Sequence, residues 1–262
     1  MSNGSLRPVA LVTGPTSGLG AGFAEKLASR GYDLVLVARD EQRLQELSNK
    51  LARDYGAESE ILPADLASVE GRDAVAERLS KGVQFLVNNA GFGTSGEFWE
   101  ADPALLQAQL DVNVTAVMQL TRAALPPMIA AAKGSIINVA SVAGLISGRG
   151  STYSASKAYV VAMTEGLSGG LAGTGVRVQA LCPGFVHTEF HERAGIAMES
   201  IPKLMWLNVD QVVCTSLEDL DKGKVICVPG LQYKVITSAG RVVPKSAVRK
   251  LNSLVGRGRG RT

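Results

Sequence analysis

Short apolar runs alternate with helical segments along the chain, and this alternation restricts the fold more than any other feature. The runs are dominated by Val, Leu and Ile, which is typical of strands buried on both faces of a parallel sheet. Seven strands are expected, at residues 9–13, 34–38, 60–63, 85–88, 135–139, 177–181 and 224–228. Right-handed crossovers place the intervening helices on both faces. The sequence therefore predicts an α/β, Rossmann-like doubly wound fold with a mostly parallel seven-stranded sheet.

Helices are expected at residues 21–30, at 41 to about 55 after the capping Asp40, and at 102 to about 125 after Asp102-Pro103. Neither a linker nor an internal repeat interrupts the 262 residues, so one domain over 1–262 is expected. Within it we expect a substrate loop at about 186–215 and a basic tail at about 241–262.

The N-terminal sequence, the length of the apolar runs and the cysteines indicate in which compartment the protein is expected. Residues 1–5 lack the charged-then-apolar order of a signal peptide, and no uncharged apolar run is long enough to span a bilayer. Three cysteines, Cys182, Cys214 and Cys227, lie far apart without a C-x-x-C spacing, and we interpret them as free thiols. A cytoplasmic location is expected.

The net charge of +3 hides an uneven distribution. Seven Lys and Arg residues and no acid follow residue 240, whereas the other 240 residues carry 20 Lys and Arg against 24 Asp and Glu, a formal charge of −4. The body is therefore not that of a nucleic-acid-binding fold. Apolar residues at helical spacing within 243–254 make the tail amphipathic, which leaves membrane contact open, although docking on its own domain or a partner subunit is favoured.

A glycine-spaced turn, TGPTSGLG at 13–20, follows the first expected strand and opens a helix. Glycines there permit a tight turn and bring backbone N–H groups close to a pyrophosphate at a helix N-terminus. The alternative is that these glycines only shape the turn.

Tyr153 and Lys157 are four residues apart, which places both on one face of a helix. An ammonium beside a phenol stabilises the phenolate and makes it a usable acid or base near neutral pH. Ser141, twelve residues before Tyr153, ends an expected strand at the edge where such sheets bind ligands. Alone, the Y-x-x-x-K pair would more often be an exposed helical pair.

Taken in order, TGPTSGLG at Thr13, NNAG at Asn88, Ser141, YSASK at Tyr153 and PGFVHT at Pro183 resemble the short-chain dehydrogenase/reductase family, in its single-domain form of about 250 residues. The resemblance covers roughly residues 8 to 190. It implies that Tyr153 is the general acid or base, that Lys157 lowers its pKa and holds the nicotinamide ribose, and that Ser141 bonds the substrate oxygen. Asn113 matches the asparagine that holds a water behind the lysine; otherwise it is a satisfied buried amide.

The same resemblance implies a set of cofactor-binding residues. Asp65 would meet the adenine, residues 89–91 the adenosine side, and residues 183–188 the nicotinamide carboxamide. The full expected set is Gly14, Thr16, Ser17, Gly18, Leu19, Gly20, Arg39, Asp65, Leu66, Asn89, Ala90, Gly91, Tyr153, Lys157, Pro183, Gly184, Val186 and Thr188.

Arg39 follows the second expected strand, where NAD-selective enzymes place an acid for the ribose 2′-hydroxyl. A guanidinium suits the 2′-phosphate of NADP instead. Asp40 could serve as that acid, but its better use is as a helix N-cap. NADP(H) is therefore favoured, with NAD(H) kept as the alternative.

Some features have competing interpretations. His187 and His191 have the spacing of helical metal ligands, but no third ligand is evident and no metal is expected. The apolar residues 196–207 either line a substrate pocket or pack on the core. Gly166, Gly169 and Gly170 either loosen the helix of Tyr153 or let subunits approach closely.

The leading hypothesis is an NADP-dependent enzyme that interconverts a carbonyl and an alcohol on an apolar small molecule, as a homodimer or homotetramer. The alternative is a dinucleotide-binding regulatory or scaffold protein without turnover. Nucleic acid is not expected as a partner.

Overall fold

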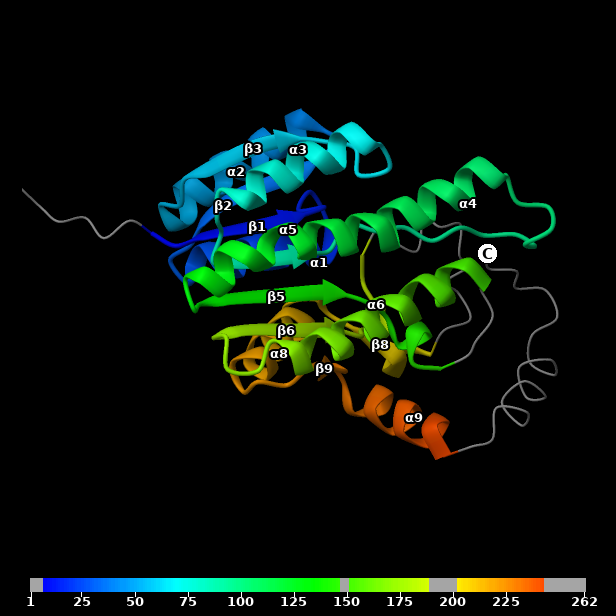
Figure 1. Ribbon diagram of the computed structural model, residues 1–262. Coiled ribbons are helices and arrows are strands. Elements are labelled where there is room, and N and C mark those ends of the chain that lie inside the picture. The colour runs from blue at the N-terminus through cyan, green and yellow to red at the C-terminus, as the bar shows by residue number, and fades with distance from the viewer. Residues whose placement is uncertain (1–6, 147–150, 189–201, 243–262) are drawn as a thin grey trace, which may run out of the picture.

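The computed structural model describes residues 7–146, 151–188 and 202–242. Its main element is a seven-stranded sheet in which all neighbouring strands are parallel (Figure 1). The expected doubly wound, Rossmann-like architecture is thus confirmed. The strands lie in the order β3 (Ser59–Pro63), β2 (Asp33–Ala38), β1 (Val9–Thr13), β4 (Phe85–Asn88), β5 (Gly134–Val139), β6 (Val176–Leu181) and β9 (Ile226–Cys227).

Two helical layers cover the sheet because successive strand residues face opposite sides. Ala10 and Val12 of β1 pack in one core cluster, and Leu11 packs in another. The first cluster is shared with α1 (Gly18–Ser29), α2 (Glu41–Tyr55) and α8 (Val209–Asp221). The second is shared with α3 (Val69–Ser80), α5 (Val117–Ala130) and α6 (Ser151–Gly170).

Two expected element bounds were wrong. The last strand, expected at 224–228, is reduced to Ile226–Cys227, because β6 pairs with it only through Ala180 and Leu181. The first helix begins at Gly18 rather than at residue 21, so the last three residues of the glycine motif lie in its first turn.

The helix expected at 102–125 is one continuous but uneven unit. It consists of α4 (Pro103–Leu110), the π-helical segment η1 (Asp111–Ala116) and α5. It was expected to end before Pro126 and Pro127, yet it continues to Ala130. A proline can adopt the helical φ angle, although it removes one backbone hydrogen bond. Beyond the two prolines the side chain of Met128, 1% exposed, packs in the core and supports the continued helix.

Regular structure is present within the region expected as a substrate loop. It holds the end of β7 (Phe185–Val186), the short helix η3 (Lys203–Met205), β8 (Trp206–Leu207) and the first half of α8, while 189–201 lie outside the described residues. Helix α9 (Leu231–Val242) reaches the start of the expected tail, and 243–262 lie outside the described part. None of the described helices is long and apolar enough to cross a membrane.

Helix α6 continues through Gly166 and Gly169 and ends at Gly170, so the first two glycines do not interrupt it. A side chain at any of the three would meet no atom within 4 Å.

The strand order reverses at β1, whose neighbours β2 and β4 lie on opposite sides of it. Parallel sheets of this kind leave a crevice beyond the carboxyl ends of the strands at such a point. The fold therefore positions a ligand site beyond Thr13, Ala38 and Asn88.

Candidate functional site

A cleft of about 840 Å³ lies at the carboxyl ends of the strands. Its wall contains every expected site residue except Gly20 and Asn113. The site is therefore assembled from five separate stretches of the chain, after β1, β2, β3, β4 and β5, together with α6 and the segment after β6.

The glycine turn after β1 depends on backbone conformation and close packing. Gly14 and Gly18 have φ angles of 65° and 54°, which favour glycine over residues with a side chain. Gly20 does not line the cleft, and it needs to be glycine for another reason. A Cβ there would overlap the carbonyl oxygen of Gly14 and approach Asn89 Nδ2 at 2.5 Å. Gly20 thus lets α1 pack against the turn rather than touching a ligand.

The start of α1 differs from the starts of α2, α3, α4 and α8. Its N-cap residue, Ser17, makes no side-chain capping hydrogen bond. By contrast, α2, α3, α4 and α8 are each capped by a side chain, from Asp40, Ser68, Asp102 and Asn208 respectively. Because α1 also begins at the cleft wall, its first N–H groups and its dipole suit an anionic group such as a pyrophosphate.

The ends of β1 and β4 are held together by polar contacts that the sequence did not indicate. The Asn89 amide donates to the carbonyl oxygens of Thr13 and Gly14, both at 3.0 Å. Thr13 Oγ1 in turn accepts from the backbone N–H groups of Asn89 and Ala90, also at 3.0 Å. Asn89 therefore fixes the glycine turn, in addition to lining the cleft.

The segment after β2 supplies two cationic side chains and the N-cap residue of α2. Arg39 and Arg43 both line the cleft. Asp40 lies between them and its Oδ1 accepts from the Arg43 N–H at 3.0 Å, which confirms it as the N-cap of α2. Arg43 was not among the expected residues, although its place in the first turn of the helix behind Arg39 was a usable signal.

Tyr153 and Lys157 lie on α6 and both line the cleft. Lys157 Nζ lies 5.8 Å from the centre of the Tyr153 ring and donates to the Val139 carbonyl oxygen at 2.9 Å. The side chain is 4% exposed, and burial lowers the pKa of Lys157 to about 8. The ammonium thus remains the main form at neutral pH, close to the phenol.

Ser141 lies at the end of β5, where its Oγ accepts from the Ala143 N–H at 3.2 Å and begins the short helix η2 (Val142–Gly144). It lines the same cleft as Tyr153 and Lys157. The structure thus brings together these three expected residues.

Asn113 is fully buried in the π-helical segment and does not line the cleft. Its amide bonds the backbone of Phe92 on both sides: Oδ1 accepts from the N–H at 3.1 Å and Nδ2 donates to the carbonyl at 2.9 Å. A Cβ built on Gly91 would lie 2.9 Å from Asn113 Oδ1 and 3.4 Å from Lys157 Nζ. The Asn113 amide is thus hydrogen-bonded to the backbone of Phe92 and lies near the lysine.

An apolar wall of the cleft was missed because its residues lie in a segment without a recognisable motif. It is formed between β4 and the end of η1 by Phe92, Leu105, Ala108 and Val112. Thr94 lines the cleft beside them and accepts from Gln109 Nε2 at 3.0 Å. The larger part of this end of the cleft is therefore hydrocarbon.

The apolar segment 196–207 was expected either to line a substrate pocket or to pack on the core. Met205 and Leu207 pack on the core, Leu204 is 80% exposed, and none of these three lines the cleft. The ring of His187 stacks on Trp206 at 4.5 Å, while His191 lies outside the described residues. Within the described part of the chain, no group of three or more potential ligands could hold a metal ion.

None of the three cysteines forms a disulfide, as expected; Cys182 and Cys227 are buried, whereas Cys214 is half-buried. Burial raises the pKa of the Cys227 thiol.

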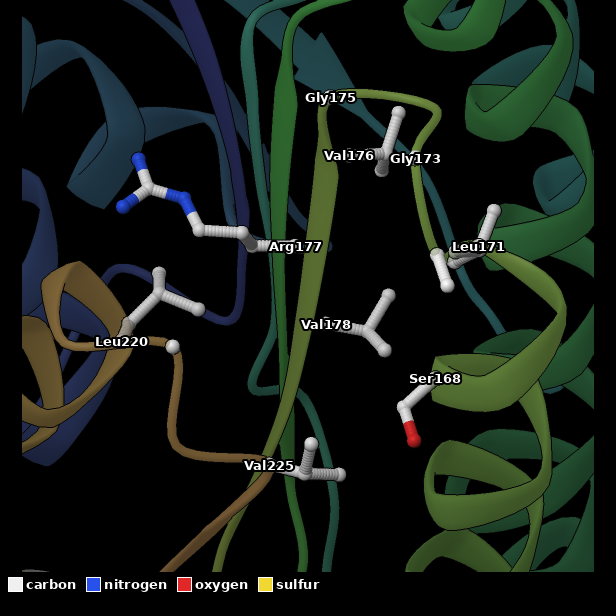
Figure 2. Close-up of a pocket in the computed structure, with 11 residues that line it drawn as sticks. Ser168, Leu171, Gly173, Gly175, Val176, Arg177, Val178, Leu220 and Val225 are labelled. Carbon is white, nitrogen blue, oxygen red and sulfur yellow. The ribbon is translucent and has the colours of Figure 1, made fainter.

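A smaller cavity, of about 360 Å³, lies near the amino end of β6 (Figure 2). Val176 and Val178 point toward α6, whereas Arg177 projects to the other side of the strand, where its guanidinium lies 3.8 Å from Asp221 Oδ1. Apart from Arg177, its lining consists of aliphatic residues, glycines and Ser168. The one charged residue in its lining, Arg177, is paired with Asp221, so the cleft is the candidate site.

The fold and the cleft define a Rossmann-like protein with a candidate ligand site at the carboxyl ends of its strands. The family model described as short chain dehydrogenase matches residues 8–198. The chain belongs to this family of oxidoreductases.

Known relatives agree with this assignment. An uncharacterized oxidoreductase of Staphylococcus saprophyticus is 39% identical over 187 residues, which cover 69% of this chain and 79% of the relative. A short-chain dehydrogenase of Sphingobium yanoikuyae in complex with NADPH is 35% identical, with a TM-score of 0.82 over 89% of this chain and 93% of that one. A Burkholderia phymatum family member in complex with NAD is 31% identical, with a TM-score of 0.77 over 88% and 92%. Both of these solved family members thus bind a nicotinamide dinucleotide.

Proposed function

We propose that the protein is an NADP(H)-dependent oxidoreductase that interconverts a carbonyl and an alcohol on a small apolar molecule. The observation that carries this proposal is the buried Lys157 ammonium, 5.8 Å from the centre of the Tyr153 ring, in the same cleft wall as Ser141. An acid or base and a hydrogen-bond donor for a substrate oxygen are thus available together.

The cofactor would lie across the crevice beyond β1, where the strand order reverses. Its pyrophosphate would face the uncapped start of α1 at Thr16 to Leu19, its adenine Asp65 and Leu66, and its nicotinamide Pro183, Gly184, Val186 and Thr188. The nicotinamide supplies or accepts the hydride. The positive φ angles of Gly14 and Gly18, together with the absence of a Cβ at Gly20, support this fit.

In the reducing direction, charge develops on the substrate oxygen as the carbonyl is reduced. The Ser141 hydroxyl donates a hydrogen bond to that oxygen, and the Tyr153 hydroxyl transfers its proton to it. The Lys157 ammonium stabilises the phenolate that remains on Tyr153. Oxidation runs through the same groups in reverse, with the Tyr153 phenolate as base.

Asn113 remains a prediction as the residue that holds a water behind Lys157. Its hydrogen bonds to the N–H and the carbonyl of Phe92 support a role in positioning this part of the cleft wall close to Lys157.

NADP is favoured because Arg39 and Arg43 line the cleft after β2, while the Asp40 carboxylate, which also lines it, caps α2. Two guanidiniums suit a 2′-phosphate better than a 2′-hydroxyl. The bound NAD of the Burkholderia relative makes NADH the necessary comparison.

An apolar substrate is favoured by the hydrocarbon wall of Phe92, Leu105, Ala108 and Val112. Such a wall gives shape selection and excludes water from the reacting atoms, whereas Ser141 and Tyr153 supply the polar contacts.

The test is loss of NADPH absorbance with a panel of apolar ketones and aldehydes. Tyr153→Phe should lower kcat by about 10²- to 10⁴-fold, the range for removal of a general acid or base. Tyr159→Phe is the matched control, because Tyr159 lies on the same helix, is 39% exposed and does not line the cleft. Equal activity of the two variants would overturn the mechanism, and cofactor binding without turnover would instead favour a regulatory protein.

A further inference from the structure

The expected nicotinamide segment, residues 183–188, is contacted on its far side by the last described helix. Every residue of the segment except His187 lines the cleft, whereas Tyr233 of α9 contacts the same stretch without lining the cleft. In Figure 1, α9 is drawn in orange and lies apart from the helices that cover the sheet. The support behind this part of the cleft wall therefore comes from the C-terminal part of the chain.

The ring of Tyr233 occupies the space that a side chain at residue 184 would take. A Cβ built on Gly184 would overlap this ring, so the ring lies directly on the Gly184 backbone. Tyr233 is 2% exposed and packs in the same core cluster as Val186 and Leu207. Glycine is thus needed at 184 because a buried ring approaches the backbone closely.

The hydroxyl of Tyr233 joins the same segment to a third part of the chain. It accepts from the Phe185 N–H at 2.9 Å and donates to the carbonyl oxygen of Met205, the last residue of η3. Burial raises the pKa of Tyr233, so the hydroxyl keeps its proton at neutral pH and remains a donor. One hydroxyl therefore connects α9, η3 and the cleft wall.

Tyr233 also completes the pairing of β7. Phe185 and Val186 pair with Trp206 and Leu207 of β8, and the His187 N–H donates to the Leu207 carbonyl at 3.1 Å. Alternate N–H groups of a strand point to the same side, so the Phe185 N–H is the preceding donor on that side. Its acceptor is the Tyr233 hydroxyl, which thus takes the place of a strand carbonyl at the start of β7.

We propose that Tyr233 is a positioning residue for the nicotinamide end of the cleft, a role that rests on the proposed NADP(H)-dependent activity. Its ring holds Gly184 and its hydroxyl holds Phe185, and together they set the wall against which the nicotinamide would bind. Tyr233 does not line the cleft, so it acts through this segment. Such placement matters for hydride transfer, because a displacement of about 1 Å can lower a rate by about 10²-fold.

The competing interpretation is that Tyr233 only attaches α9 to the core. In that case its loss would lower the free energy of unfolding, and the affinity for all parts of the cofactor would change together or not at all. A ligand that binds the cleft without a nicotinamide distinguishes the two roles.

The experiment compares NADPH with 2′-phospho-ADP-ribose, which has the adenosine, 2′-phosphate and pyrophosphate of NADP but no nicotinamide. Isothermal titration calorimetry with the full chain gives both affinities. Tyr233→Phe keeps the ring and removes the hydroxyl, so the segment loses a contact and must be ordered when the nicotinamide binds. The variant should bind NADPH about three- to tenfold more weakly, with a change of less than about twofold for 2′-phospho-ADP-ribose.

Thr237→Val is the matched control. Thr237 lies one turn further along α9 and is 6% exposed, and its hydroxyl bonds the carbonyl oxygens of Tyr233 and Lys234 rather than the cleft segment. This variant loses a buried hydroxyl from the same helix with little change of shape. It should bind both ligands as the wild type does.

A double-mutant cycle tests the ring contact separately from the hydroxyl. Gly184→Ala places a methyl group against the ring, whereas Tyr233→Leu removes the ring. If the ring lies on Gly184, the loss of NADPH affinity in the double variant should be at least about threefold smaller than the product of the two single losses, as expected for residues in contact. Losses that multiply would show that the two residues act independently and would overturn the proposal.

Three titration results would also overturn it. Tyr233→Phe could bind both ligands as the wild type does, it could lose affinity for both equally, or Thr237→Val could show the same selective loss. Failure of the wild type to bind either ligand would instead overturn the proposed function, and this role with it. Because the titrations need no turnover, their outcome does not depend on the identity of the substrate.

Discussion

The two ends of the sheet differ in how their polar groups are satisfied. At the carboxyl end, α1 begins without a side-chain cap, and Lys157 is buried with its ammonium bonded to one backbone carbonyl and facing a phenol. At the amino end of β6, the cavity lining is mainly aliphatic, and its one charged residue, Arg177, pairs with Asp221. Polar groups directed at the carboxyl-end cleft can act on a ligand, whereas the cavity at the amino end offers only packing.

The largest effect is expected at the glycine turn. Gly20→Val should weaken NADPH binding by about 100-fold, because the added side chain overlaps Gly14 and overpacking of this kind costs ~3 kcal/mol. Isothermal titration calorimetry measures the change. Ser168→Leu, in the amino-end cavity, is the control and should leave the affinity unaltered. A loss in both variants would break the contrast between the two ends.

Arg39→Ala should come next, with a loss of about 10- to 100-fold in NADPH affinity and less than about twofold in NADH affinity, as expected for a charge-assisted phosphate contact. Arg53→Ala, an exposed arginine on α2 paired with Asp54, is the matched control. Similar losses for both cofactors would contradict the NADP assignment.

Lys157 predicts a pH effect on stability. The folded protein releases this proton near pH 8, whereas the unfolded chain holds it to about 10.5, so the unfolded state binds more protons in this window. Lys157 therefore makes the free energy of unfolding rise with pH between 8 and 10.5. Thermal unfolding across that range should show this contribution as a difference in slope between the wild type and Lys157→Met. Equal slopes for the wild type and Lys157→Met would mean that Lys157 titrates normally.

The smallest effect separates the two readings of Asp40. As a cap, Asp40→Ala should cost about 1 kcal/mol of stability with little change in either cofactor affinity. Ser68→Ala removes the corresponding cap of α3 and should behave alike in denaturant unfolding. A selective fall in NADH affinity for Asp40→Ala would show instead that this carboxylate meets the ribose.

The sequence by itself determined the parallel sheet, the glycine turn, and the Tyr153, Lys157 and Ser141 set, because strand burial, turn chemistry and helical spacing are local properties. Asp40 was also readable as a cap, since capping involves residues three positions apart.

Only the tertiary structure decided what depends on residues far apart in the chain. Asn89 holds the turn at Thr13 across β1 and β4, Asn113 bonds Phe92, and Phe92 joins Leu105 and Val112 in an apolar wall. The depressed pKa of Lys157 and the exposure of Leu231 likewise depend on what packs around each side chain. Spacing along the chain reports which face a residue shares, whereas burial and contact across the sheet exist only once the layers have packed.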